Sequence, residues 1–535
     1  MVLNNGQSAL EASIEKRRTF AIISHPDAGK TTLTEKLLLF GGAIRLAGSV
    51  KGRKTKKYAT SDWMEIEKQR GISVTSSVMQ FAYKEHLINI LDTPGHQDFS
   101  EDTYRTLLAA DSAVMLIDAA KGVEPQTIKL FEACRLQQIP VFTFINKLDR
   151  FGKEPLDLLE EIEQVLGMRS CPLNWPIGMG YDFRGIYDRR NNQIELFKGD
   201  DEREIIPAIG SWQENTEVRE FLDNTQIKQL EEEIGLLDIA GDPFDQEKID
   251  AGKLTPVFFG SAINNFGVQT FLDQFLQLAP PPQPHKSNQG YIDPAEQGFS
   301  GFIFKIQANM DPAHRDRIAF MRICSGQFQR GMIATHARQG KKIKLSQPQQ
   351  FFAQSRDIIE EACAGDIVGI YDPGIFQIGD TVYEGKPLEY EELPQFSPEY
   401  FAKVFIKEAM KQKRFYKGLK QLAEEGAVQV YKSFLNGSED IILGVVGELQ
   451  FEVFQFRLLH EYGAEVILER LPHRLARWVR GEEIKTQELK SMNSLLAKDR
   501  FGQLVVLFKN ETALNWVQSK NPTLNFVTTN REPLA

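Results

Sequence analysis

The chain has 535 residues, which exceeds the size of one hydrophobic core and predicts about three domains. It contains 63 Lys and Arg residues against 73 Asp and Glu residues, a net charge of −10. This balance gives no overall attraction for nucleic acid, so we expect no DNA binding and only local contacts with any RNA.

The first 18 residues mix polar and charged types without the apolar run of a secretion signal or membrane anchor, and no later stretch is long and apolar enough to span a membrane. The cysteines show no paired spacing, which argues against a zinc site and a disulfide framework. They are Cys134, Cys171, Cys324 and Cys363. A cytoplasmic protein fits these features best.

Residues 19–260 alternate short apolar runs with helical patterns, which is typical of a parallel sheet covered by helices. The expected buried strands are residues 20–24, 87–91, 113–117, 141–145 and 257–259. Ligands of such α/β sheets bind at the carboxyl ends of the strands. Functional residues are therefore expected where these runs end.

Residues 178–250 are acidic and weakly periodic, and we interpret them as an insertion with its own helices. For the run Glu231–Glu233 within it, a solvated helical face is favoured over a binding site.

The proline cluster at residues 280–284 cannot continue a helix and predicts a domain boundary. Alternating apolar residues and regularly placed glycines then predict a small antiparallel barrel, and the last part mixes helical and strand periods. The predicted domains are an α/β P-loop domain at 1–283, a β-barrel domain at 284–390 and a C-terminal α+β domain at 391–535.

A phosphate-binding loop is predicted where the first strand ends and a helix begins. Backbone N–H groups and the helix N-terminus would surround the phosphates, Lys30 would neutralise the outer ones, and the Thr31 hydroxyl would bind Mg²⁺. Ser24 replaces the usual first glycine of the pattern. The loop residues are Ser24, His25, Pro26, Asp27, Ala28, Gly29, Lys30 and Thr31.

A second polar segment closes the strand at 87–91. Asp92 can accept a hydrogen bond from a magnesium-bound water, and Gly95 can offer its N–H to a terminal phosphate. A common Pro-Gly turn is the alternative for this segment taken alone. Together with the phosphate loop it predicts nucleotide hydrolysis. The segment is Asp92, Thr93, Pro94, Gly95 and His96.

The segment after the strand at 141–145 identifies the base. The Asp149 carboxylate can accept both the N1 and the N2 hydrogens of guanine, and adenine has no such donor pair. Asn146 is expected to connect this loop to the phosphate loop, and the stem of Lys147 to cover one face of the base. Ser261 and Ala262, after the last strand, are expected to present backbone N–H groups to guanine O6. With Leu148, these residues predict a site for GTP and GDP.

Residues 66–73 (IEKQRGIS) and 92–96 (DTPGH) resemble the switch regions of the translational GTPases, the family of elongation factor G. The resemblance implies that Ser73 closes over Mg²⁺ and that His96 is catalytic, orienting the attacking water. At the position of Ser73 the family usually has threonine, so the packing methyl group is lost.

Within that family, the chain is most similar to the class II peptide-chain release factors of bacteria. The segments 61–64 (SDWM), 304–312 (FKIQANMDP), 314–317 (HRDR) and 418–429 (GLKQLAEEGAVQ) carry the similarity, which covers about residues 16 to 475. The resemblance implies a ribosome-stimulated GTPase that promotes departure of class I release factors without reading stop codons. It also implies a monomer.

Two basic stretches, 51–57 (KGRKTKK) and 411–417 (KQKRFYK), are candidates for ribosomal RNA contact, with a solvated charged surface as the alternative for each. Two other functions stay open at this point. One is a translocase-like or ribosome-protecting GTPase that lacks distal domains, and the other is a nucleotide-sensing switch without useful hydrolysis.

Overall fold

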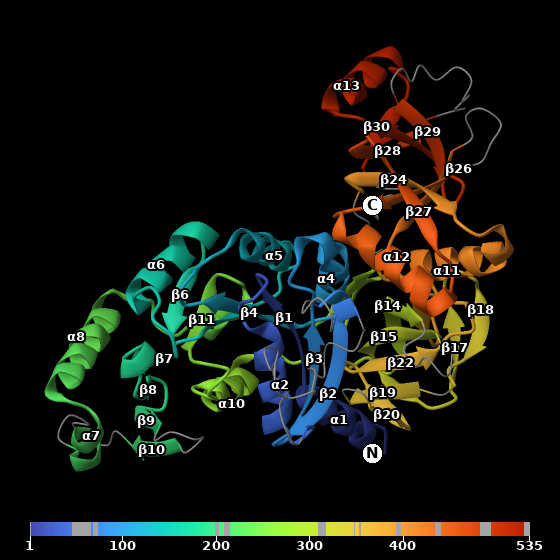
Figure 1. The fold of residues 1–535 in the computed structure, drawn as a ribbon. Helices are drawn as coiled ribbons and strands as arrows, with labels where there is room; N and C mark the ends of the chain where they lie inside the picture. The colour runs from blue at the N-terminus through green and yellow to red at the C-terminus, as the bar shows by residue number, and fades with distance from the viewer. Residues whose placement is uncertain are drawn as a thin grey trace.

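The computed structural model describes residues 2–44, 66–67, 73–197, 203–207, 215–308, 317–346, 348–352, 355–391, 397–433, 440–481 and 494–528. Figure 1 shows three parts: an α/β part in the middle and left of the view, a β part to its right, and an α+β part above the β part. Within the described residues, no helix is long and apolar enough to cross a membrane.

The first part is built on a seven-stranded sheet in which all neighbouring strands are parallel except β2 and β3. In spatial order the strands are β2 (Ser77–Tyr83), β3 (His86–Asp92), β1 (Arg17–Ser24), β4 (Ser112–Asp118), β5 (Val141–Asn146), β11 (Leu254–Phe259) and β6 (Arg169–Pro172). The five strands expected from the apolar runs all lie in this sheet.

Helices cover both faces of this sheet. Two pack on one face, namely α2 (Lys30–Phe40) and α10 (Val268–Leu278). Three pack on the other face, namely α4 (Ser100–Leu107), α5 (Pro125–Leu136) and α6 (Pro155–Leu166). The short α9 (Gln246–Asp250) precedes β11. The two apolar cores therefore fix the sheet from both sides, and its carboxyl edge carries the loops discussed below.

The region expected to be a helical insertion also contains a sheet. An antiparallel sheet precedes the helices, with strands β7 (Asn174–Ile177), β8 (Gly185–Asp188), β9 (Gln193–Phe197) and β10 (Arg203–Pro207). The helices are α7 (Thr216–Phe221) and α8 (Asn224–Ala240), at the far left of Figure 1. Glu233 of the acidic run accepts a 2.6 Å hydrogen bond from Trp175 Nε1. One of the three acidic residues, Glu233, therefore has a structural role.

The second part follows the proline cluster and the hairpin β12 (His285–Ser287) and β13 (Gly290–Ile292). Its eight-stranded sheet runs β18 (Lys341–Lys344), β17 (Ile333–His336), β23 (Thr381–Tyr383), β14 (Ser300–Ala308), β15 (Arg317–Ser325), β22 (Ile367–Tyr371), β19 (Pro348–Phe352) and β20 (Ser355–Ile358). A further pair is β16 (Gln327–Gln329) with β21 (Glu361–Cys363).

Strand β14 departs from the expected alternation of buried and exposed residues. Lys305 and Gln307 belong to the expected solvent face but are buried, 4% and 2% exposed. An irregularity between Ile303 and Lys305 shifts the register, and β14 packs against α4 of the first part. On the two faces of the same strand, Phe302 joins the core of the first part and Ile303 joins the core of the second. This strand belongs to two cores.

The C-terminal part has an eight-stranded antiparallel sheet with strands β27 (Val466–Leu471), β24 (Tyr400–Ile406), β26 (Asp440–Val445), β25 (Gln429–Ser433), β29 (Ser494–Asp499), β30 (Leu504–Phe508), β28 (Leu475–Arg480) and β31 (Asn525–Val527). Its helices are α11 (Gln412–Glu424), α12 (Leu449–Tyr462) and α13 (Glu511–Lys520). Figure 1 shows α11 and α12 on the side facing the other two parts.

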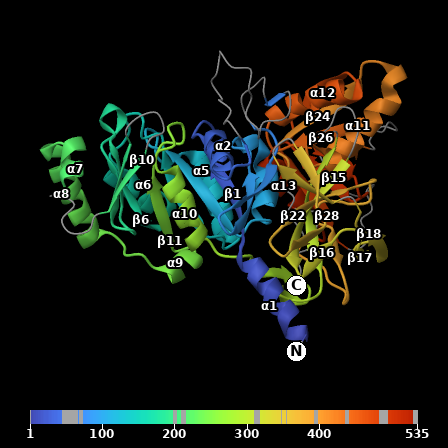
Figure 2. The same cartoon turned by 90° about the horizontal axis from the view of Figure 1, so that it is seen from below.

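Buried polar contacts join the parts. Arg322 Nη2 of β15 donates to both carboxylate oxygens of Asp111 in the first part, at 2.6 and 2.8 Å, and both side chains are 1% exposed. Arg457 of α12 pairs with Glu425 at 2.7 Å, and Glu425 also accepts from the N–H of Ala308. Figure 2 shows helix α1 (Val2–Glu15) projecting beneath the sheet. Ile14 of that helix packs on Cys363.

Candidate nucleotide-binding site

The phosphate loop lies between β1, which ends at Ser24, and α2, which begins at Lys30. Gly29 precedes the helix in the left-handed conformation at φ 101°, and a Cβ there would lie 2.3 Å from Asn146 Nδ2. No side chain caps this end of α2. The N–H groups of its first turn are therefore free to bind an anion, as the sequence predicts.

Lys30 and Asp92 meet at the carboxyl ends of two neighbouring strands. Asp92 ends β3, which pairs in parallel with β1 so that Ile22 lies opposite Asp92. Lys30 Nζ contacts Asp92 Oδ1, and the Lys30 side chain is 7% exposed. The other oxygen, Asp92 Oδ2, is buried without a hydrogen-bond partner, and Thr31 is half-buried beside Lys30. An unpaired buried carboxylate oxygen suits an acceptor for a metal-bound water.

The segment that follows Asp92 lies against the phosphate loop. Thr93 Oγ1 donates a 2.7 Å hydrogen bond to the carbonyl of Ile22. A Cβ at Gly95 would lie 3.4 Å from both the Ser24 oxygen and the Pro26 nitrogen. Pro94 accepts a hydrogen bond from Thr103 of α4. The DTPGH segment is thus held against the phosphate loop.

His96 sits at the partly exposed end of this segment, with a side chain that is 36% exposed. Its Nδ1 accepts a hydrogen bond from the N–H of Asp98 at 3.2 Å, within the turn η1 (Gln97–Phe99). Nδ1 is therefore an acceptor, which leaves Nε2 to contact a water molecule.

Asn146 makes the connection expected from the sequence. Its Nδ2 donates to the carbonyl of Ala28 in the phosphate loop at 2.9 Å, and its Oδ1 accepts from the N–H of Ala262 at 2.9 Å. One buried side chain therefore fixes the phosphate loop, the end of β5 and the loop after β11 relative to one another.

Lys147 and Asp149 extend from this junction. Lys147 is left-handed at φ 73°, and its Nζ donates to Asp118 Oδ2 at 2.7 Å and to the Asp27 carbonyl. Asp149 Oδ1 accepts from Ser261 Oγ at 2.5 Å. The N–H of Leu148 donates to the carbonyl of Gly260. The structure therefore brings Lys147, Asp149 and Ser261 together. The N–H groups of Ser261 and Ala262, expected to face guanine O6, instead donate to the Phe266 carbonyl and to Asn146 Oδ1.

Two residues that the sequence interpretation missed belong to these loops. Asp118, at the end of β4, accepts a hydrogen bond from Lys147. Its position at the end of an apolar strand could have identified it from the sequence. Asp98 contacts His96, but its second partner, the N–H of Leu449, is 351 residues away in the chain. No local pattern predicts such a distant contact.

Part of the first predicted switch is described. Ser73 is half-buried, and Glu67 Oε1 accepts from the N–H of Val74 at 2.9 Å. The other residues of the 66–73 segment, at 68–72, lie outside the described residues. So do the SDWM segment at 61–64, the basic stretch at 51–57 and residues 309–316.

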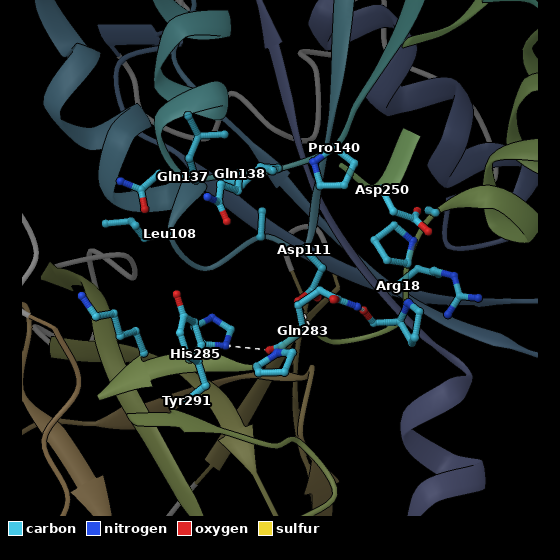
Figure 3. Close-up of a pocket in the computed structure, with 18 of the residues that line it drawn as sticks. Arg18, Leu108, Asp111, Gln137, Gln138, Pro140, Asp250, Gln283, His285 and Tyr291 are labelled. Carbon is cyan, nitrogen blue, oxygen red and sulfur yellow. Dashed lines mark hydrogen bonds between the residues drawn. The ribbon is translucent and has the colours of Figure 1, made fainter. Parts of the chain in front are cut away.

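A separate cleft of about 1250 Å³ lies between the first two parts (Figure 3). Two charged groups on its walls have partners within the protein: Asp111 pairs with Arg322, and Arg18 donates to backbone carbonyls. His285 Nδ1 contacts the carbonyl of Gln283, the dashed line in Figure 3. None of the predicted nucleotide-binding residues lines this cleft.

Three family profiles match successive parts of the chain. "Elongation factor Tu GTP binding domain" matches residues 15–281, "Elongation factor G domain 2" matches 298–385, and "Class II release factor RF3, C-terminal domain" matches 390–518. These matches agree with the expected fold classes in chain order.

Curated relatives are similar over nearly the whole chain. A peptide chain release factor 3 of Symbiobacterium thermophilum is 61% identical over 519 residues, 97% of this chain and 98% of the relative. One of Listeria innocua is 58% identical over 516 residues, 96% and 98% of the two chains. A crystal structure of a Thermus thermophilus protein matches with a TM-score of 0.70 at 22% identity, covering 91% of this chain and 72% of that one, and shows a shared fold.

Proposed function

Because the chain belongs to the peptide chain release factor 3 family of translational GTPases, we propose that it is a ribosome-dependent GTPase of translation termination. In this proposal it promotes dissociation and recycling of class I release factors, does not read stop codons, and works in the cytoplasm. The observation that carries the proposal is the identity of about 60% over nearly the full length of curated relatives.

The proposed nucleotide roles follow the three loops. The first-turn N–H groups of α2 and the Lys30 ammonium bind the β- and γ-phosphates, and Asp149 accepts the N1 and N2 hydrogens of guanine. Ser261 Oγ donates to Asp149 Oδ1, which keeps the carboxylate in place for the base. Lys147 is held by Asp118 so that its stem covers the purine face.

Magnesium is proposed to bind the hydroxyls of Thr31 and Ser73 and the phosphate oxygens, with Asp92 Oδ2 accepting from a metal-bound water. Among the described residues no three His, Cys, Asp or Glu side chains gather as metal ligands, so this ion depends on the nucleotide. When bound, Mg²⁺ neutralises charge on the phosphates.

Hydrolysis needs a water molecule in line with the γ-phosphate. We assign the orientation of that water to His96 Nε2, because Nδ1 is already occupied by the N–H of Asp98. Gly95 N–H and Lys30 stabilise the charge that develops on the phosphoryl oxygens. This arrangement predicts slow hydrolysis by the free protein and stimulation by the ribosome.

Contact with ribosomal RNA is proposed for the basic stretch at the start of α11. Lys413, Arg414 and Lys417 are exposed, whereas Phe415 between them is buried. Three cations on the outer face of an anchored helix are suited to phosphate contacts, which give affinity rather than sequence specificity.

The test is turnover of a class I release factor on terminated ribosomes. We expect the protein with GTP to accelerate multiple rounds of release at a limiting amount of the class I factor. We also expect ribosomes to raise its GTPase rate by about 10³-fold or more, as in related GTPases whose catalytic site is completed by a second molecule. A stimulated GTPase that leaves release-factor turnover unchanged would favour the translocase-like alternative. A lack of ribosome stimulation would favour the non-hydrolytic switch.

A further inference from the structure

Helix α12 of the C-terminal part is capped by a carboxylate from the first part. The first N–H groups of a helix have no partner inside the helix. The N–H of Leu449, the first residue of α12, donates to Asp98 Oδ2 at 2.7 Å, while the helix's own N-cap residue Glu448 makes no side-chain cap. Two domains therefore share one helix cap.

The same aspartate touches His96. The Asp98 N–H donates to His96 Nδ1, and Asp98 Oδ1 lies 3.3 Å from that nitrogen. The Asp98 side chain is 11% exposed against 36% for His96. The better-buried residue thus fixes the orientation of the more exposed imidazole.

Gly447 provides the space for this contact. A Cβ at Gly447 would lie 2.0 Å from Asp98 Cγ and 2.3 Å from Oδ1. Gly447 does not adopt the left-handed conformation, so glycine is required here for space and not for the backbone. An alanine at this position would push the Asp98 carboxylate away without straining its own backbone.

An apolar cluster accompanies the cap. Phe99 of η1 packs with Ile66 and Val74, which flank Ser73, and with Val453 of α12. Leu449 and Phe456 pack against the same cluster. One end of α12 therefore contacts the segments on either side of Ser73 and the turn after His96.

We propose that Asp98 is a positioning residue for GTP hydrolysis, which transmits the position of α12 to His96 through the cap on Leu449. This inference rests on the proposed function, because it assumes that His96 orients the water. Nucleotide binding does not pass through Asp98, since the phosphate and base loops are tied by Asn146 and Ser261. Loss of the cap should lower the rate of hydrolysis and leave GTP affinity unchanged.

The experiment measures single-turnover GTP hydrolysis at saturating GTP, with and without ribosomes, and GTP affinity separately. Asp98→Ala and Gly447→Ala should each lower the ribosome-stimulated rate by about 10- to 100-fold. Asp98→Asn should stay within about threefold of the wild type, because its amide oxygen can still accept from the N–H of Leu449 and so keep the cap. Gly235→Ala, in α8 where a Cβ meets nothing within 4 Å, is the matched control.

The double variant Asp98→Ala/Gly447→Ala separates positioning from damage to α12. If Gly447→Ala acts only by displacing Asp98, the double variant should hydrolyse GTP at the rate of Asp98→Ala alone. Multiplied losses would overturn the proposal, as would Asp98→Asn at the Asp98→Ala rate, wild-type rates in both single variants, or faster hydrolysis without ribosomes. Failure of the proposed function is distinct, since the wild type itself would then show no ribosome stimulation.

Discussion

The loops at 146–149 and at 92–99 both follow strands of the same sheet, but they take their supporting contacts from different parts of the molecule. Asn146, Lys147 and Asp149 bond to Ala28, Asp118 and Ser261, all in the first part. The turn after His96 instead bonds to Leu449 of the C-terminal part. The loop predicted to read guanine is therefore held within one part of the molecule, whereas the turn after His96 is also held by the C-terminal part.

Replacing His96 by alanine tests the second loop and should have the largest effect. We expect the ribosome-stimulated rate of GTP hydrolysis to fall by about 10²- to 10⁴-fold, because the imidazole that orients the attacking water is lost. Rapid-quench hydrolysis at saturating GTP measures this rate. Gln97→Ala, an exposed neighbour in the same turn, should keep the wild-type rate. Full activity of the His96 variant would remove this residue from the mechanism.

Asp149→Asn tests the first loop. GTP affinity should fall by about 100-fold or more, and preference should move toward xanthosine triphosphate, because the amide presents a donor where xanthine offers an oxygen. Competition binding with labelled nucleotide measures both quantities. Asp157→Asn, exposed in α6, serves as the control. If GTP still bound Asp149→Asn as tightly as the wild type, base recognition would lie elsewhere.

Asn146→Ala asks whether the tie between the loops matters for binding. It leaves the Ala28 carbonyl and the Ala262 N–H without their partner, at a cost of about 1–3 kcal/mol, so GDP and GTP affinities should both fall about tenfold. Isothermal titration measures them. At saturating GTP the ribosome-stimulated rate should change little, since the second loop is untouched. A selective loss of rate would contradict the separation of the two loops.

The smallest effect is expected far from both loops, at His473 between β27 and β28. Burial, with a smaller contribution from Lys509, lowers the pKa of His473 to about 4. Between that value and the ordinary pKa near 6.5 the unfolded chain binds the extra proton, so stability falls as pH falls through this window.

His473→Gln removes this titration. Its melting temperature, measured by calorimetry, should drop less than that of the wild type between pH 7 and pH 5. The corresponding difference in the free energy of unfolding is at most about 1.4 kcal/mol per pH unit. Its GTPase activity at pH 7 should be normal. Equal acid sensitivity of the two proteins would show that His473 is not buried in its neutral form.

The sequence predicts the local parts of this molecule well. Asp92 and Asn146 end apolar strands, and Lys30 begins the helix that follows another one, so their meeting at one sheet edge follows from parallel topology. The order of the segments was enough to predict the fold class and the GTPase activity.

The contacts between domains could not be predicted in this way. Lys305 looks like a surface residue of an alternating strand, yet it is buried, and its ammonium contacts the carbonyl of Ser76 in the first part. Lys305 is buried because the register of its strand shifts and because a different domain covers it. The cap between Asp98 and Leu449 has the same origin, because one-dimensional periodicity carries no information about which domain surfaces meet.

Strand β14 has a consequence for synthesis of the chain. Phe302 and Tyr390 belong to the same apolar cluster as Leu107 and Val141 of the first part. When the ribosome has made only the first 283 residues, part of that cluster has nothing to cover it. Domains tend to fold in order from the N-terminus during translation, but this one gains its full cover only after Tyr390 has emerged. Residues 1–283 expressed alone should therefore expose apolar surface and aggregate more readily than the longer chain.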